Sequence, residues 1–442
     1  METLRVLELY SGIGGMQYAL KQSGISGQVV AAIDINTTAN QVYRHNFPDT
    51  PLWNRTIEGI SLDEFKNLQF DMILMSPPCQ PFTRLGRQRG IADPRTKSFL
   101  YILNLLPRLS QLPRFILLEN VKGFESSSAR QYFVQILMEC GYIFQEVMVS
   151  PTSVGIPNSR LRYFLMAKIS TESICSNSKD LQMSPLTAET ESSVEPSLSS
   201  PQKPVTSSLE KEEGMEDCVL YKLETANDAQ RKLNQNRNLS IRQIQDFLEP
   251  QENDDMDQYL VPSDVLLRYA LILDIVKPIC RRSICFTKGY GRYVEGTGSV
   301  LQCYLETEIE SVFKNLDQFS EEEKLQQLQG LKLRYFTPRE VANIMGFPKS
   351  FSFPDQIPTR QRYKLLGNSL NVVVVTKLLH QLLSKWVSPS TRSCRECRSW
   401  RNVSSAPPDY SLRASRNVYT FVLKSGCPRK RNAHLFVYVE GH

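Results

Sequence analysis

Four side chains in the first half of the chain have the types and spacing that nucleophilic catalysis requires. Cys79 lies in S-P-P-C-Q-P-F (76–82), where the neighbouring prolines fix the backbone around a thiol. Glu119 ends the apolar run R-F-I-L-L-E, and burial would raise the pKa of its carboxyl group so that it could donate a proton near neutral pH. Arg160 and Arg162 are two residues apart at the start of an expected strand, which places both on one face, and such a pair repels unless an anion lies between them. The four residues are therefore a candidate nucleophile, a candidate acid and a candidate cationic pair.

A glycine-rich turn, Y-S-G-I-G-G (10–15), follows the first apolar run and opens a helix. Glycines allow a tight turn and the close approach of a ligand to the backbone, while the helix N-terminus favours a negative group. Asp34 ends the next apolar run, about 20 residues later, where a carboxylate can bind ribose hydroxyls. Because the spacing departs from G-x-G-x-x-G, a nucleoside that carries a carboxylate, such as S-adenosylmethionine, fits as well as a dinucleotide would. A purely structural turn is the alternative.

The elements that must position these residues alternate between apolar strands and helices. We expect strands at 5–10, 28–33, 70–75, 114–119, 142–149 and 162–167. We expect helices between them at 15–23, 37–46, 98–110 and 129–140. This alternation predicts an α/β fold with a mostly parallel sheet covered by helices on both faces. Each candidate residue taken singly could be a buried thiol, a helix cap or a salt bridge, but together they should meet at the carboxyl edge of that sheet, where such folds bind ligands.

The segment that follows Cys79 is unusually basic. Residues 84–97, R-L-G-R-Q-R-G-I-A-D-P-R-T-K, contain five basic side chains, one acidic side chain and two glycines. A loop of this kind beside a candidate nucleophile suggests a clamp on a polyanion. A solvated surface loop is the alternative interpretation.

The middle of the chain divides by composition. Residues 171–217 contain eleven serines, ten acidic side chains and no aromatic residue, which predicts a disordered insertion. Order should return over 218–335, with a helix at 259–276 and a glycine-bearing loop at 288–298.

The last hundred residues contain a return segment and a basic tail. Helices at 338–345 and 371–386 close the body of the protein. The tail, 387–442, carries ten Lys and Arg side chains and three acidic ones, and we expect it to be poorly ordered apart from a strand at 417–423. Its C-R-E-C pair at 394–397 lacks well-spaced partners for zinc, so no metal site is expected.

Composition excludes some classes of protein. The 442 residues are 41% hydrophobic and 22% charged, with no apolar run long enough to span a bilayer and no signal peptide at the N-terminus. The ten cysteines are expected to be reduced thiols in a cytoplasmic or nuclear protein. The net charge of +6 comes from the tail, so it gives no argument that the body binds nucleic acid.

Together these segments resemble a cytosine-5 methyltransferase that uses S-adenosylmethionine. The matches run in that family's order: E-L-Y-S-G-I-G-G, Asp34, S-P-P-C-Q-P-F, E-N-V-K-G, N-S-R-L-R, Y-F-T-P-R-E-V-A-N-I-M-G-F-P (335–348) and L-G-N-S-L-N (366–371). The resemblance covers roughly residues 4–386 apart from the acidic insertion. It implies a doubly wound sheet of the S-adenosylmethionine-dependent methyltransferase type with a smaller target-recognition domain. An amino-methyltransferase would more typically carry a proline-proline-aromatic loop without the cysteine.

The resemblance implies the catalytic roles. Cys79 would attack carbon 6 of cytosine, while Glu119, hydrogen-bonded at the ring nitrogen, stabilises the intermediate. Arg160 and Arg162 would hold Glu119, the loop and the base. Water would take the carbon-5 proton, because none of the four histidines lies in a matching segment. The base must leave its stack to reach such a pocket.

The resemblance also implies a cofactor site for S-adenosylmethionine. It places the methionine portion near Tyr10, Gly12, Ile13, Gly14 and Gly15, the ribose on Asp34, the adenine beside Ile57 and Glu58, and Ser76 and Ser369 close by. Two departures from the family pattern are mild: Tyr10 replaces a phenylalanine, and I-E at 57–58 replaces an aspartate-led pair.

Two features favour RNA over DNA as the substrate. The chain begins almost at its first strand, without the large N-terminal region of eukaryotic DNA methyltransferases, and C-F-T-K-G-Y-G (285–291) resembles the signature of the tRNA-methylating branch. That branch acts on cytosine 38 in the anticodon loop of aspartate tRNA. The alternative interpretation of Cys285 is a core thiol. A DNA methyltransferase and a non-catalytic nucleic-acid-binding protein are the other hypotheses.

These features predict five segments and one principal partner. The segments are a catalytic part at 1–170, the insertion at 171–217, a target-recognition domain at 218–335, the return segment at 336–386 and the tail at 387–442. The expected partner is tRNA, with weak DNA binding, no membrane association and a monomeric state.

Overall fold

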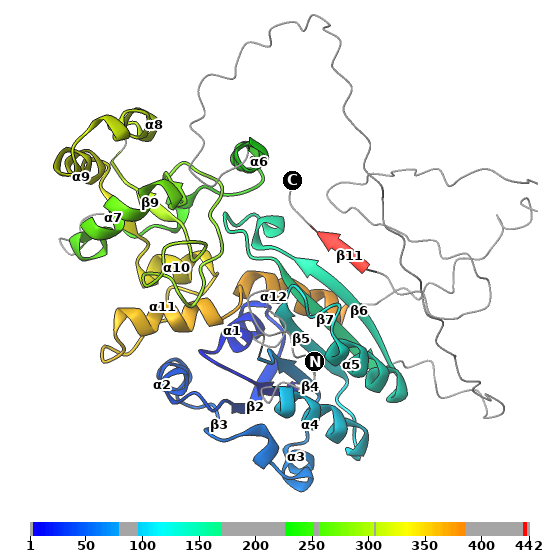
Figure 1. Cartoon of the computed structure of the whole chain (residues 1–442). Coiled ribbons are helices and arrows are strands. Elements are labelled where there is room, and N and C mark those ends of the chain that lie inside the picture. The colour runs from blue at the N-terminus through cyan, green and yellow to red at the C-terminus, as the bar shows by residue number, and fades with distance from the viewer. Residues whose placement is uncertain are drawn as a thin grey trace, which may run out of the picture.

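The computed structural model describes residues 3–78, 96–169, 226–250, 256–304, 306–384 and 436–439 (Figure 1). Cys79, nearly all of the basic loop at 84–97, the acidic insertion and most of the tail lie outside these residues.

The centre of the fold is an eight-stranded sheet. Its strands, in spatial order, are β11 (Phe436–Val439), β6 (Tyr142–Val149), β7 (Arg162–Ile169), β5 (Phe115–Val121), β4 (Met72–Met75), β1 (Leu4–Leu9), β2 (Gly27–Ile33) and β3 (Leu52–Trp53). Only β7 runs antiparallel to its neighbours β5 and β6, and the other pairs are parallel. The predicted α/β fold with a mostly parallel sheet is therefore confirmed.

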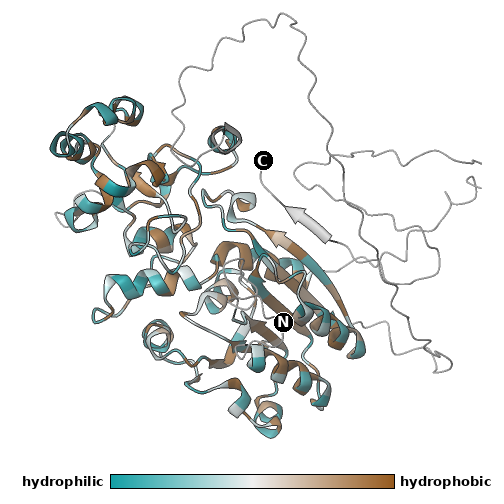
Figure 2. Ribbon diagram, viewed as in Figure 1, coloured by the Kyte–Doolittle hydropathy of each residue, from teal (hydrophilic) through white to brown (hydrophobic). Residues whose placement is uncertain are grey.

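Helices cover both faces of this sheet, as the near-continuous burial of its strands requires. One face packs against α1 (Gly15–Gln22), α2 (Thr37–Asn46) and α12 (Val372–Leu383). The other packs against α3 (Leu62–Leu68), α4 (Lys97–Leu105) and α5 (Ser128–Glu139). Figure 2 shows the apolar residues concentrated where the strands and helices meet.

A second, three-stranded sheet forms the smaller part of the molecule. Its order is β10 (Leu333–Tyr335), β9 (Val300–Gln302) and β8 (Ile275–Val276). It has its own apolar core, to which α7 (Ser263–Tyr269), α8 (Ile309–Lys314) and α9 (Glu321–Gly330) contribute. The helix α6 (Ala226–Arg237) lies nearby, where Lys232 pairs with the buried Asp274 at 2.8 Å. The domain boundaries expected from the sequence stay a prediction.

The predicted helix at 259–276 is wrong. The segment contains a short 3-10 turn at Met256–Tyr259, then α7 and another 3-10 turn at Ala270–Ile272, and it ends in strand β8. Pro262 is the N-cap residue of α7 and lies outside the helix. A proline lacks the amide donor that a helix running through this position would need. The apolar residues of 270–276 belong to a turn and a buried strand, which periodicity alone cannot distinguish from a buried helix.

The return segment brings residues near the C-terminus back to the first strand. After α10 (Pro338–Ile344) and α11 (Thr359–Asn368), α12 packs directly on α1. Thr376 Oγ1 donates to the carbonyl of Ala19 at 3.3 Å, and Gln22 donates to the carbonyl of Gly346 at 3.2 Å. The segment L-G-N-S-L-N ends α11 and leads into α12, and its Ser369 and Leu370 lie against Gly15, at the end of the turn that follows β1. Among the helices that the structure describes, none is long and apolar enough to cross a membrane.

Candidate active site

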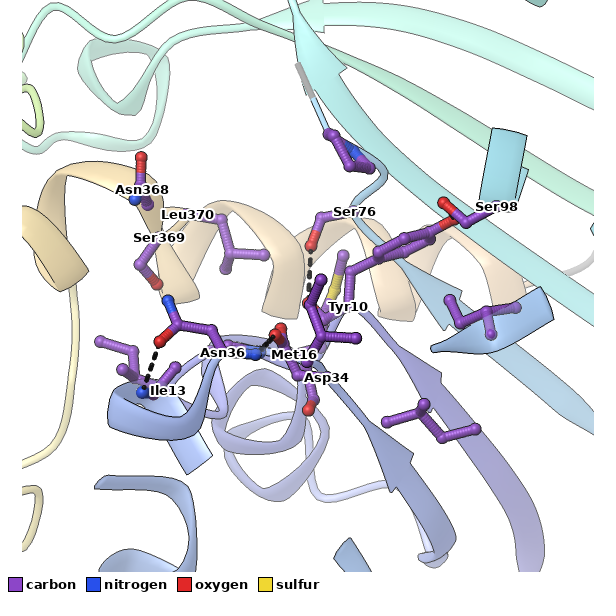
Figure 3. A pocket seen from close by; sticks show the side chains of 18 of the residues that line it. Tyr10, Ile13, Met16, Asp34, Asn36, Ser76, Ser98, Asn368, Ser369 and Leu370 are labelled. Atoms are coloured by element: carbon purple, nitrogen blue, oxygen red, sulfur yellow. Dashed lines mark hydrogen bonds between the residues drawn. The ribbon is translucent and has the colours of Figure 1, made fainter. Parts of the chain in front are cut away.

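A cavity of about 500 Å³ opens at the carboxyl edge of the large sheet (Figure 3). Tyr10 reaches it from the end of β1, Asp34 from the end of β2, Ser76 from the end of β4 and Glu119 from β5. The sequence-predicted residues that line the cavity are Tyr10, Gly12, Ile13, Gly15, Asp34, Ile57, Glu58, Ser76, Glu119 and Ser369.

The glycine turn forms one wall of the cavity. Gly12 has φ 54°, and among the described residues other than its chain neighbours no atom lies within 4 Å of the position that a Cβ would take, so this backbone is open to a ligand. Gly14 does not line the cavity. It is the N-cap of α1 with φ 85°, and a Cβ there would lie 2.4 Å from the ring of Phe47, so this position has no room for a side chain.

Asp34 is the charged group of the same wall. One carboxylate oxygen accepts from the amide of Gly12 at 2.9 Å and the other accepts from the amide of Asn36 at 2.8 Å. Burial raises the pKa of Asp34, while these backbone donors oppose that rise. The carboxylate is thus fixed in direction by the turn that it faces.

Tyr10 connects the glycine-turn wall of the cavity to α4. Its hydroxyl donates to Ser98 Oγ at 2.9 Å, and its carbonyl accepts from Ser76 Oγ at 3.3 Å (Figure 3). Tyr10 has φ 57°, a left-handed conformation that is uncommon for a bulky residue. The two side-chain contacts hold the residue in that conformation, with its ring against the cavity.

Glu119 and Arg162 form a pair at the other end of the cavity. Arg162 Nε lies 3.5 Å from Glu119 Oε1, and Glu119 is only 9% exposed. Burial raises the pKa of Glu119 even though Arg162 and Arg160 act to lower it. A carboxyl group with a raised pKa beside a cavity can hold a proton and donate it.

Arg160 has a different setting from the one that the sequence predicts. The strand β7 begins at Arg162, so Arg160 precedes the strand and does not start it. Its guanidinium donates to the carbonyls of Phe286 and Gly367, each at 3.1 Å, and to the carbonyl of Ser369. Arg160 therefore connects its own segment to the backbones of two others, at Phe286 and at 367–369, while among the described residues Arg162 alone is ion-paired with Glu119.

Cys285 lies between the two arginines. Arg160 and Arg162 donate to its sulfur at 3.3 and 3.9 Å. Burial acts to raise the pKa of this thiol, but the two guanidinium groups lower it below its ordinary value. Cys285 is thus more than a core thiol, because its sulfur helps to fix the arginine pair.

Three further predicted residues line the cavity from two elements, a 3-10 helix and the segment after α11. Ile57 and Glu58 belong to the 3-10 helix Ile57–Gly59, and Ser369 follows α11. Cys79 lies outside the described residues; Pro78, which precedes it in the sequence, lines the cavity. Within the described ranges, no group of three or more His, Cys, Asp or Glu could hold a metal ion.

Sequence reasoning missed several cavity residues. Asn36 caps α2 and faces the cavity, Ser98 is in the first turn of α4, and Asn368 precedes Ser369 in the late G-N-S. An Asn two residues after Asp34, where a helix starts, is a capping signal that could have found Asn36. Ser98 has no comparable signal, since its contact with Tyr10 spans 88 residues of sequence.

The family described as "C-5 cytosine-specific DNA methylase" matches residues 4–384, and the chain belongs to that family. It is therefore a cytosine-5 methyltransferase, an enzyme that uses a methyl donor.

Similar proteins extend along nearly the whole chain. The human protein named tRNA (cytosine(38)-C(5))-methyltransferase is 54% identical over 395 residues, which cover 86% of this chain and 99% of that protein. A Spodoptera frugiperda protein of the same name is 41% identical over 85% of this chain and 98% of its own. The crystal structure of a DNMT2 mutant from Spodoptera frugiperda superposes with a TM-score of 0.65 at 38% identity, covering 86% of this chain and all of that one. The S. pombe Dnmt2 methyltransferase gives a TM-score of 0.63 at 34% identity, covering 86% and 98%.

Proposed function

We propose that this enzyme transfers a methyl group from S-adenosylmethionine to carbon 5 of a cytosine in tRNA, at cytosine 38 of the anticodon loop of aspartate tRNA. The observation that carries the tRNA substrate is the 54% identity, over 99% of its length, to the human protein named for that reaction.

The cavity supports S-adenosylmethionine as the methyl donor. Ser11 Oγ is buried in the cavity wall without a hydrogen-bond partner among the described residues, which leaves it available to a polar ligand. The open backbone at Gly12 and the carboxylate of Asp34 suit the amino-acid and ribose portions, and Ile57 with Ile35 suits a flat apolar base. When bound there, the cofactor supplies an electrophilic methyl group.

The other end of the cavity supports chemistry on the base. Glu119 would donate a hydrogen bond to the ring nitrogen of cytosine, since burial raises its pKa, and Arg162 would fix the direction of its carboxyl group. Cys79 is the proposed nucleophile for carbon 6, where it adds to the ring and leaves after water removes the carbon-5 proton. Arg160 would act by holding together the segments that form this end.

Duplex DNA is the second candidate substrate. The matching family is described as a DNA methylase, and a Dictyostelium discoideum relative named DNA (cytosine-5)-methyltransferase is 36% identical over 86% of this chain. We also propose weak binding of DNA, a monomeric enzyme and a cytoplasmic location with a nuclear fraction, and these stay predictions.

Methyl transfer from labelled S-adenosylmethionine to tRNA and to duplex DNA tests the proposal. We expect 5-methylcytidine in tRNA and little or no label in DNA. Replacing Cys79 with alanine should abolish transfer and leave cofactor binding nearly intact. Transfer to DNA but not to tRNA would overturn the substrate, and turnover by Cys79→Ala would overturn the covalent mechanism.

A further inference from the structure

Two tyrosines in the loop 287–298 lie in opposite environments. Tyr290 is 2% exposed, and its hydroxyl donates to the carbonyl of Ser299 and accepts from the amide of Phe336. Tyr293, three residues later, is 57% exposed. The first tyrosine anchors the loop in the core, and the second presents an aromatic ring to solvent.

The backbone that carries Tyr293 is held in place. The amides of Arg292 and Tyr293 donate to the carbonyl of Gly289 at 3.0 and 2.9 Å, and Thr297 Oγ1 donates to the carbonyl of Tyr293 at 2.7 Å. A Cβ at Gly298 would lie 2.4 Å from the ring of Tyr290, so the loop backbone packs tightly against that ring. A ring on such a backbone binds a partner with little loss of conformational entropy.

The loop also adjoins the active-site cavity. Arg160 donates to Phe286 at the start of the loop and to Gly367. A Cβ on Gly367 would lie 2.2 Å from the amide nitrogen of Lys288, so the two backbones are in contact. Gly367 immediately precedes Asn368, which lines the cavity. Lys288 is followed by Gly289, which packs against the ring of Tyr293, so this ring lies only a few residues from the cavity wall.

The charges around the ring suit a nucleic acid. Arg292 is exposed, and its guanidinium lies over the ring of Tyr293, 4.9 Å from the centroid. Lys288 is exposed as well, and Glu295 is the one acidic residue of this loop. Aromatic rings and guanidinium planes stack on unpaired bases, and the cations add attraction to phosphates.

We propose that Tyr293 and Arg292 form a stacking site for an unpaired nucleotide of the tRNA, beside the base that enters the cavity. This inference rests on the proposed function, because it assigns a second contact to the same substrate. The site would act on tRNA affinity and on the positioning of the anticodon loop, and it makes no contact with the reacting atoms.

Equilibrium binding of tRNA and steady-state methyl transfer test this site with three variants. We expect Tyr293→Ala to raise the Kd and the KM for tRNA about tenfold, with kcat at saturating tRNA nearly unchanged. Tyr293→Phe keeps the ring and should bind like the wild type. Arg292→Gln should reduce the dependence of log Kd on log salt by about one unit, whereas Tyr293→Ala should leave that slope unchanged.

The matched control is Tyr304→Ala. Tyr304 is also 57% exposed, but it follows the end of β9 that points away from the loop 287–298, so its variant should bind tRNA like the wild type. Binding by Tyr293→Ala within twofold of the wild type, or equal losses in Tyr293→Phe and Tyr293→Ala, would overturn the stacking site. An absence of methyl transfer to tRNA by the wild-type enzyme would instead overturn the proposed function, so the two failures are distinguishable.

Discussion

The two ends of the cavity are built in different ways. At the cofactor end, the decisive contact joins Gly12 and Asp34, which are 22 residues apart. At the catalytic end, Arg160 bonds to Cys285 and Gly367, which are 125 and 207 residues away. The contact that orients Asp34 is therefore local in the sequence, whereas the contacts of Arg160 form only when the second sheet and the return segment are docked on the first sheet.

This difference predicts which substitutions act on one end only. Changes at the cofactor end should alter cofactor affinity and leave the chemical step nearly intact. Changes at the catalytic end should alter the chemical step, together with stability where the altered residue joins segments.

Arg160→Lys is expected to affect both the chemical step and stability. A lysine cannot donate to the carbonyls of Phe286, Gly367 and Ser369 in the fixed geometry of a guanidinium, so the segments should shift relative to Glu119. We expect a fall of about 100-fold in the single-turnover rate of methyl transfer and a loss of about 2 kcal/mol in the free energy of unfolding. Arg108→Lys, on an exposed arginine, is the matched control. Full activity in Arg160→Lys would show that the docking contacts do not shape the site.

A second prediction concerns the stability of β1, the strand that precedes Tyr10. Glu8 is fully buried in β1, where it accepts from the hydroxyl of Tyr43 in α2 at 2.7 Å, and burial raises its pKa to about 8 from 4.5. The folded state therefore favours the protonated form, so this stabilising contribution is complete below pH 4.5 and is lost as the pH rises toward 8. The free energy of unfolding should fall by roughly 1.4 kcal/mol per pH unit within that range.

Denaturant unfolding of Glu8→Gln as a function of pH checks this expectation. The variant has no carboxyl group to titrate, so its stability should depend less on pH than that of the wild type. Glu139→Gln, on an exposed carboxylate, should keep the wild-type dependence. Parallel pH profiles for Glu8→Gln and the wild type would contradict the assignment.

A tenfold effect on binding is expected for Asp34→Asn. The substitution removes the charge that faces the cavity but keeps an oxygen that can accept from Gly12 or Asn36. We expect the Kd for S-adenosylmethionine to rise about tenfold, with the single-turnover rate at saturating cofactor nearly unchanged. Because burial raises the pKa of Asp34, wild-type affinity should also weaken as mildly acidic pH protonates it. Titration calorimetry at several pH values measures both effects.

The smallest effect is expected for Tyr10→Phe. The variant loses the hydrogen bond to Ser98 Oγ and keeps the ring against the cavity. The net contribution of one hydrogen bond to the free energy is about 1 kcal/mol, so the Kd for the cofactor should rise by no more than about fivefold. Ser98→Ala should have the same effect, and the double variant should show no further loss. Additive losses would mean that the two side chains act independently.

The same contrast explains what the sequence could predict. The ends of the predicted strands, the glycine turn and Asp34 follow from local patterns, and the structure has them within one or two residues of the expected positions. The prediction of one helix over 259–276 was wrong because a buried turn and strand have the same apolar composition as a buried helix. The bonds from Arg160 to Phe286 and Gly367 could not be predicted, since nothing local to residues 158–164 specifies partners so remote in the sequence.

Glu119→Gln tests the separation of the two ends most directly. The single-turnover rate of methyl transfer to tRNA and the Kd for S-adenosylmethionine are measured on the same protein, with Glu139→Gln as the control. We predict a fall in rate of about 100-fold or more, because glutamine has no acidic proton to donate, with the Kd within about threefold of the wild type. A rate within tenfold of the wild type, or a Kd that changes as much as the rate, would contradict this account of the site.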